Sequence, residues 1–128
     1  VLYRRALQKD PLSESFKQGQ QQALLELKNA QFLSDGLRFL EGNLYGDAMK
    51  ALRQVTKGSV YRQEANLQIE DLYLKKEDWI VRGKKAYKKR RYKEAERLYS
   101  YAVSIDPTDE TVVALQKKAA RKAKRSRR

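Results

Sequence analysis

The sequence predicts an all-α protein, and three observations support that fold class. Leu, Ala, Lys, Glu, Gln and Arg dominate the 128 residues, and all six are helix formers. Only two prolines and six glycines interrupt them, too few for a linker-rich or disordered chain. The apolar residues recur at spacings of three and four, the period of an amphipathic helix. Hydrophobic residues make up 41% of the chain, which is enough for the core of one domain.

The first hairpin of helices is predicted from residues 13–41 and about 46–57. An apolar stripe with spacings of three and four runs along the long helix from Phe16 to Leu40, which indicates one buried face. This helix follows the Asp10-Pro11 dipeptide, where the proline ends any preceding helix. Because the connection to the short helix is brief, the two helices are expected to run antiparallel.

The second hairpin is predicted from residues 59–89 and 92–105. Gly58 and Ser59 stand before the long helix and read as a helix stop followed by an N-cap. The apolar stripe of the long helix is interrupted only by Lys76. Since neither a proline nor a turn cluster divides this segment, we expect one continuous helix.

A last helix is predicted over about 109–124. Residues 106–109, with the sequence Asp-Pro-Thr-Asp, break the chain before it, and Asp109 is expected to cap its first turn. Apolar residues such as Val112 and Ala119 indicate that this helix closes the end of the helical stack.

The positive charge is concentrated in the last third of the chain. The formal net charge is +13, of which residues 82–97 carry +7, while residues 117–128 hold eight basic residues and no acid. The eight are Lys117, Lys118, Arg121, Lys122, Lys124, Arg125, Arg127 and Arg128. Such a field attracts nucleic acid, lipid headgroups or an acidic protein surface, and the alternative is a solvated helix face and tail.

The chain matches itself at a shift of 47 positions. The matched pairs include Phe32 with Trp79, Gly36 with Gly83, Tyr45 with Tyr92, and Ala48 with Ala95. At a shift of 96, residues 2–11 match residues 98–107 with Leu, Tyr, Ala, Asp and Pro identical. These spacings predict three related units of about 48 residues each.

Residues 76–109 resemble a tetratricopeptide repeat (TPR). The matching residues are Trp79, Gly83, Tyr87, Tyr92, Ala95, Tyr99, Ala102 and Pro107. Gly83 and Ala95 are small enough for the two helices of a hairpin to approach closely, and Pro107 ends the second helix. The resemblance implies an α-solenoid of antiparallel helical hairpins.

Two other segments of the chain resemble less complete copies of the same repeat. Residues 29–62 resemble a degenerate copy, in which Val60 stands where the proline should be, and residues 1–11 resemble the end of a third. We therefore expect a repeat domain over residues 1–116 and a basic tail over 117–128. Because the first unit is represented only by its end, the sequence is expected to be a piece of a longer repeat protein.

The unit length departs from that family. The usual TPR period is about 34 residues, whereas the spacings here are 47 and 49. Each copy is therefore preceded by about 13 to 15 additional residues, which we place in an extension of its first helix. These extensions either project from the edge of the solenoid or thicken its core.

The resemblance implies a non-catalytic scaffold or adaptor that binds a partner's peptide or helix in a groove lined by the first helices. The positions that match the groove are Leu33, Leu37, Leu40, Glu41, Ile80, Lys84, Tyr87 and Lys88. The later positions are mixed and basic, which suits an acidic or amphipathic segment. The Lys and Asn pair with which some TPR proteins clamp a carboxylate is absent, because Leu33, Leu37, Ile80 and Lys84 occupy its positions.

Composition argues against catalysis. The chain contains neither His nor Cys, which excludes imidazole and thiolate mechanisms and Cys/His zinc sites. The acidic pairs, such as Glu70-Asp71, are neighbours in sequence and diverge by about 100° on a helix, so they make no paired-carboxylate site. We expect no enzyme, no metal and no cofactor.

A second function remains open, namely binding of nucleic acid or an anionic membrane surface through residues 82–97 and 117–128. Tyr87 and Tyr92 lie among these basic residues, where aromatic rings stack on bases, although the repeat assigns both to packing. Self-association through exposed repeat surfaces is a further possibility. No apolar run approaches the length of about 18 residues needed to span a bilayer, and nothing in this chain reads as a signal peptide. The compartment is not indicated.

Overall fold

The structure is a computed structural model that describes residues 11–126. These residues form five α-helices and no strand, which confirms the all-α fold class. The helices are α2 (Pro11–Glu41), α3 (Tyr45–Arg53), α4 (Arg62–Lys88), α5 (Tyr92–Ile105) and α6 (Glu110–Ser126). The predicted partial repeat over residues 1–11 lies almost wholly outside the described residues.

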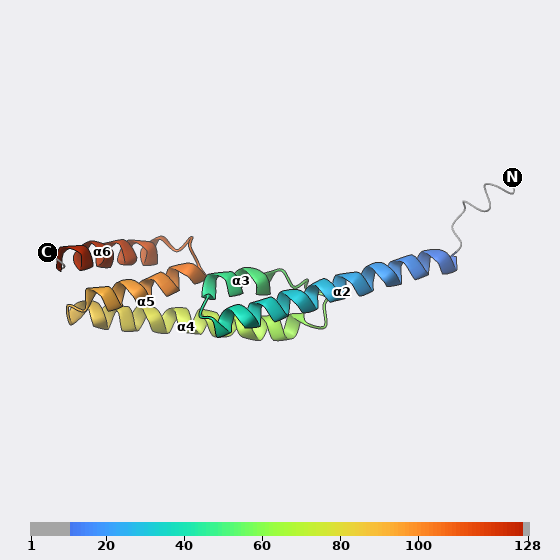
Figure 1. Cartoon of the computed structure of the whole chain (residues 1–128), viewed down its shortest axis with the longest axis horizontal. Coiled ribbons are helices and arrows are strands. Elements are labelled where there is room, and N and C mark those ends of the chain that lie inside the picture. Colours follow the sequence, from blue (N-terminus) through green and yellow to red (C-terminus); the bar gives the residue numbers. More distant parts are fainter. Residues whose placement is uncertain (1–10, 127–128) are drawn as a thin grey trace.

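Consecutive helices run antiparallel along one elongated molecule (Figure 1). Helix α2 packs on α3, α4 packs on α5, and α6 packs on α5. The short helix α3 also contacts both α4 and α5, so that the first hairpin meets the second at the middle of the long helix α4 (Figure 1). Helix α6 runs without interruption across the domain boundary expected at residue 116.

The N-cap predicted at Ser59 is wrong. Helix α4 begins at Arg62, and Ser59 lies in the turn before it. The Oγ atom of Ser59 accepts a hydrogen bond from the N–H of Tyr61 at 3.1 Å and donates one to Oε2 of Glu26 at 3.1 Å. Because Glu26 on α2 binds this hydroxyl, Ser59 joins the loop to the first hairpin instead of starting α4.

The turn between the two helices of each hairpin has the same backbone geometry. Asn43 has a φ of 60° and Arg90 a φ of 62°, and they are 47 positions apart. In each turn the next residue donates its N–H to a carbonyl five residues earlier in the long helix, at 2.9 Å. This bond satisfies a carbonyl that the helix end would otherwise leave unpaired. The sequence match at that shift is therefore also a match of local structure.

The close approach of the two helices in each hairpin depends on a glycine of the long helix. A Cβ atom added to Gly36 would lie 2.7 Å from Cδ2 of Leu52, and one added to Gly83 would lie 2.6 Å from Cε1 of Tyr99. Leu52 and Tyr99 are also 47 positions apart. The packing role predicted for Gly83 is thus confirmed, and its equivalent in the first hairpin plays the same role.

An aromatic cluster joins the two hairpins. The ring centroid of Trp79 on α4 lies 4.6 Å from that of Tyr45 on α3 and 5.4 Å from that of Tyr101 on α5, and the two tyrosine rings are 5.2 Å apart. Trp79 belongs to the main buried core. The other buried members of that core are Met49, Leu52, Val55, Ala65, Leu72, Leu98, Ala102, Ile105 and Val112.

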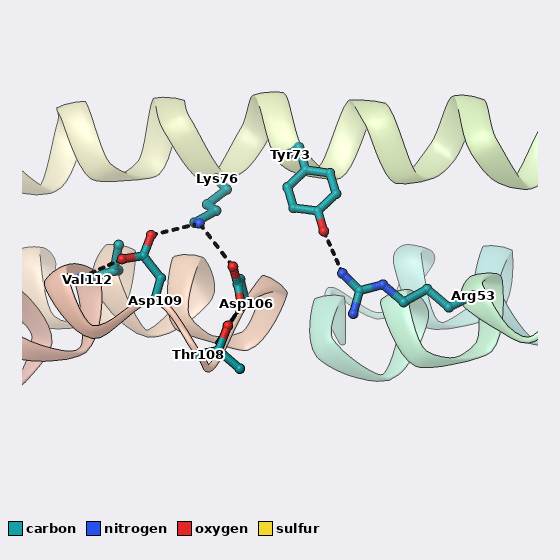
Figure 2. Close-up of polar contacts among 7 residues, drawn as sticks. All are labelled: Arg53, Tyr73, Lys76, Asp106, Thr108, Asp109 and Val112. Atoms are coloured by element: carbon teal, nitrogen blue, oxygen red, sulfur yellow. Dashed lines mark hydrogen bonds and ion pairs between the residues drawn. The ribbon is translucent and has the colours of Figure 1, made fainter.

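Each long helix also buries one polar side chain that holds the loop after the following short helix. Asn29 on α2 donates to Oγ1 of Thr56 at 2.9 Å and accepts from the N–H of Thr56 at 3.1 Å. Lys76 on α4, at the equivalent position, donates from Nζ to Oδ2 of Asp109 at 3.0 Å and lies 3.8 Å from Oδ2 of Asp106 (Figure 2). The lysine that interrupts the apolar stripe therefore fastens the α5–α6 loop to α4.

The charges of this cluster change one another's pKa values. Burial by itself would lower the pKa of Lys76, but the hydrogen bond to Asp109 and the charges of Asp109, Asp106 and Glu77 outweigh it, so that the pKa is raised. The hydrogen bond from Lys76 is the main cause that lowers the pKa of Asp109. The pKa of Asp106 is lowered mainly by its hydrogen bonds with Thr108, with a smaller contribution from Lys76.

We expect the free energy of unfolding to fall below about pH 4, and Lys76→Met to weaken this dependence. A carboxyl group with a lowered folded pKa stabilises the fold fully above its unfolded pKa of about 3.9, and that contribution disappears as the pH falls through the folded value. Urea denaturation between neutral pH and pH 2 measures the effect. Lys75→Met is the matched control, because Lys75 pairs with Asp71 on the exposed face at 3.3 Å. An unchanged acid dependence in Lys76→Met would contradict the cluster.

Candidate binding site

The topology gathers the basic segments at one end of the molecule. The last turns of α4, the first turns of α5 and the last turns of α6 all lie at that end, because consecutive helices are antiparallel (Figure 1). Residues 82–97 and the described part of 117–128 are therefore neighbours in space. Positive charge that the sequence distributes over two segments is therefore concentrated at one end of the molecule.

One pocket at this end is lined by side chains from three helices. Its lining residues are Lys84, Tyr87 and Lys88 of α4, Tyr99 of α5, and Leu115 and Lys118 of α6. We call it the α4–α6 pocket. Its volume is about 200 Å³. Two larger depressions, of about 640 Å³ and 370 Å³, are each lined by one helix, α5 and α2 respectively. Because groups from separate elements converge only in the first of these three, it is the best candidate site.

The α4–α6 pocket combines an apolar floor with a cationic rim. Tyr99 is almost fully buried and Leu115 is half-buried, whereas Lys84, Lys88 and Lys118 are exposed. No acidic side chain lines the pocket. Such an arrangement offers three ammonium groups to a carboxylate while an apolar side chain enters between them.

Tyr99 contributes a phenol to the floor of this pocket. The structure records no hydrogen bond between this hydroxyl and any described residue, and every fully buried polar side-chain atom of the described residues has a partner. Burial, with a smaller contribution from Tyr87, raises the pKa of the Tyr99 phenol. A phenol is neutral at neutral pH and can donate a hydrogen bond to a ligand.

Tyr87 is held at the mouth of the pocket by contacts on two sides. Its ring meets the Tyr92 ring edge to face, with centroids 5.1 Å apart, and Nζ of Lys118 lies 5.3 Å from its centroid. The cation–π contact brings α6 to α4 across the pocket. This ring is half-buried, so it still presents one edge to a ligand.

The structure divides the predicted groove residues among three places. Lys84, Tyr87 and Lys88 line the α4–α6 pocket. Leu33, Leu37 and Glu41 line the depression on α2, together with Ala30, Ser34 and Arg38. Leu40 and Ile80 are half-buried against the main core, so little of either is left for a partner. The structure thus brings together only the α4 part of the predicted groove with residues from other helices.

Sequence reasoning missed half of the α4–α6 pocket. In the sequence, Tyr99 belongs to the repeat match and Lys118 to the basic tail, and nothing singles out Leu115. The antiparallel order of the helices does predict part of this arrangement, because an antiparallel last helix must bring residues near its C-terminus back to the end of α4. That consequence depends on α6 packing against α5, which composition alone does not establish.

The predicted anionic-partner residues lie mainly on the outer face of α6. Lys117, Lys118, Arg121, Lys124 and Arg125 are exposed, and Lys122 is half-buried. The other face of the same helix is buried, with Ala119 and Ala123 almost inaccessible. Arg127 and Arg128 lie outside the described residues.

Residues 11–126 were compared with the requirements of a metal site and of a membrane-spanning helix. They contain no group of three or more carboxylates or other ligating side chains placed to hold a metal ion. None of their helices is both long and apolar enough to cross a bilayer. Comparison of the chain with protein-family models, curated proteins and solved structures finds no match.

Proposed function

We propose that this chain is a non-catalytic interaction module of a larger assembly, which binds an acidic segment of a protein partner in the α4–α6 pocket. The single observation that supports it most is the convergence of Lys84, Lys88 and Lys118 around an apolar floor. Binding pockets for whole small ligands usually measure about 300 Å³ or more. A volume of about 200 Å³ suits one apolar or aromatic side chain of a longer peptide.

The lysine rim favours carboxylates beside that side chain. A carboxylate held by an ammonium group makes a charge-assisted hydrogen bond, about twice as strong as a neutral one. The partner would therefore present a leucine or phenylalanine flanked by aspartate or glutamate. The neutral hydroxyl of Tyr99 would donate to a backbone carbonyl or carboxylate of the partner.

We further propose that the two hairpins are diverged TPR-like units of an α-solenoid with extended first helices. Three pairs of equivalent features support this relation: the left-handed turn residues, the glycine contacts and the buried polar side chains that hold the loops. Interaction modules built from such units bind extended segments or helices on their surfaces. The pocket then lies where α6 closes the second unit.

The test is charge reversal at the rim. We expect Lys84→Glu/Lys88→Glu to weaken binding of a short fluorescein-labelled peptide of glutamates with one central phenylalanine by about tenfold or more, equivalent to about 1.4 kcal/mol. Fluorescence anisotropy measures the affinity, and circular dichroism checks the fold. Replacing the central phenylalanine of the peptide by alanine is expected to weaken binding to the unaltered chain as well.

Lys50→Glu/Lys57→Glu is the matched control. It makes the same change in net charge at exposed lysines of α3 and the following loop, away from the pocket. If both double variants lose affinity equally, the peptide responds to net charge alone and the pocket is not its site.

A second candidate function is binding of a nucleic acid through the same basic end. The observation that favours it is that residues 82–97 and the basic last turns of α6 lie at the same end of the molecule (Figure 1). The same variants are titrated with a single-stranded oligonucleotide, together with Lys117→Gln/Arg121→Gln/Lys124→Gln. Substitution is preferred to truncation at Gln116, because the deleted segment would contain the buried Ala119 and Ala123. Oligonucleotide binding that falls steeply with salt and is weakened by these three substitutions in α6 supports this alternative.

A further inference from the structure

The first half of α2 presents a stripe of exposed apolar side chains. Figure 1 shows this half of the helix extending beyond the other helices. The stripe consists of Phe16, Ala23, Leu24 and Leu27, and the three large side chains are 60–67% exposed. Most of the stability of a helix in a protein comes from the packing of its apolar face, and a contiguous exposed apolar surface usually marks an interface. We call this surface the α2 stripe.

The α2 stripe corresponds to the buried face of α6. The shift of 96 that aligns residues 2–11 with 98–107, continued along the chain, places Phe16 on Val112, Ala23 on Ala119 and Leu27 on Ala123. The three residues of α6 are at most 2% exposed. Three further residues of α2 are identical to their counterparts in α6: Glu14 with Glu110, Gln20 with Gln116, and Lys28 with Lys124.

The face of α6 that these residues form is an interface with α5. Helix α6 packs against α5 along its length. Nε2 of Gln116 donates a hydrogen bond to Oγ of Ser100 on α5 at 3.0 Å, at the edge of the apolar contact. The identical Gln20 stands at the edge of the α2 stripe and is exposed. Three buried apolar positions and one polar position of α6 therefore recur on α2.

We propose that the α2 stripe is the docking site for the short helix of another hairpin of the α4–α5 type, which covers α2 as α5 covers α6. The occupant is a short amphipathic helix like α5, whose apolar face meets Phe16, Ala23 and Leu27. It also carries a hydroxyl opposite Gln20. This inference rests on the repeat relation within the proposed function and not on the α4–α6 pocket.

A tandem chain tests whether α2 can take the place of α6. Residues 1–106 are followed directly by residues 11–128, so that Asp106 precedes Pro11 and recreates the natural Asp-Pro dipeptide. We expect amide hydrogen exchange in the first half of the second α2 to slow by about tenfold or more relative to the single chain, because this segment becomes part of a packed unit. The α5 helix of the first copy is expected to keep the protection that it has in the single chain.

Substitutions separate this contact from a general stabilisation of the tandem. Phe16→Ser in the second copy is expected to lower the urea midpoint of the tandem, while it leaves that of the single chain unchanged. Phe16→Val, which introduces the residue that α6 carries, retains the tandem midpoint. Leu74→Ser is the control, because Leu74 is 71% exposed on the outer face of α4 and is outside the proposed contact.

Three results would overturn the proposal. The first is a tandem in which neither the second α2 nor the first α5 is protected. The second is an equal response to Phe16→Ser in the tandem and in the single chain. The third is a single chain that sediments as a dimer which Phe16→Ser dissociates, because the α2 stripe would then be covered by a second α2. Loss of peptide binding in the pocket variants bears on the proposed function alone.

Discussion

Gly83→Val is expected to destabilise the protein by about 3 kcal/mol or more. A Cβ atom at this position would lie 2.6 Å from Cε1 and 2.9 Å from Cδ1 of Tyr99. Tyr99 is only 1% exposed, and its ring is held between α4 and α6, so it cannot move aside without disturbing the core. The branched valine would force α4 and α5 apart along the second hairpin. Urea denaturation followed by circular dichroism measures the loss.

Two other glycines provide graded controls. Gly36→Val meets the side chain of Leu52 and is expected to cost less, because an aliphatic side chain repacks more easily than a buried ring. Gly19 lies in the exposed part of α2 with nothing within 4 Å of an added Cβ atom. Gly19→Ala is therefore expected to stabilise the chain by about 0.5–1 kcal/mol through helix propensity. Equal stability of Gly83→Val and the unaltered chain would refute the close helix contact.

Trp79→Ala is expected to cost about 3–5 kcal/mol, the range for a large aromatic side chain deleted from a core. Trp79 is 7% exposed and contacts the rings of Tyr45 and Tyr101, which belong to α3 and α5. The variant removes the cluster that joins the two hairpins, as well as the area buried by the indole. The contact between the first hairpin and the second is expected to open most easily.

The measurement must not depend on tryptophan fluorescence, because Trp79 is the only tryptophan in the chain. Circular dichroism gives the stability, and hydrogen exchange in α3 shows whether the first hairpin opens first. Trp79→Phe keeps an aromatic ring, so its free energy of unfolding is expected to fall less than that of the alanine variant. Val81→Ala, at a half-exposed position, serves as the control. If Trp79→Ala and Val81→Ala are equally stable, the aromatic cluster contributes nothing to the joining of the hairpins.

The helices themselves were predictable, since their signals are local. The predicted short helix over residues 92–105 coincides with α5, and the predicted long helices begin and end within a few residues of α2 and α4. Apolar spacing and the Asp-Pro breaks act within a few residues, so the sequence displays them directly. The first short helix is the exception: it was expected to reach about residue 57 but ends at Arg53. There, Thr56 and Ser59 bind α2 side chains, which a local pattern does not reveal.

The candidate site was only half predictable, because its parts are distant in sequence. Lys84, Tyr87 and Lys88 stood out as a basic helix face, but Tyr99 and Lys118 come from other helices. The contacts of Lys76 could not be predicted for the same reason, since its carboxylate partners lie about 30 residues further along the chain. Its burial is favourable only because those partners are present. A pattern of residue types shows which side chains are available, and packing decides which of them meet.

The sequence by itself determined the all-α class, the order and approximate bounds of the helices, the internal repeat and the concentration of positive charge. Each of these follows from composition or from spacing along one helix. Only the tertiary structure decided that the two basic segments share one end, that Lys76 holds the α5–α6 loop, and that none of the helices α3 to α6 covers the α2 stripe. These depend on which helix faces meet, and that choice is made by the summed burial and close packing of the whole chain.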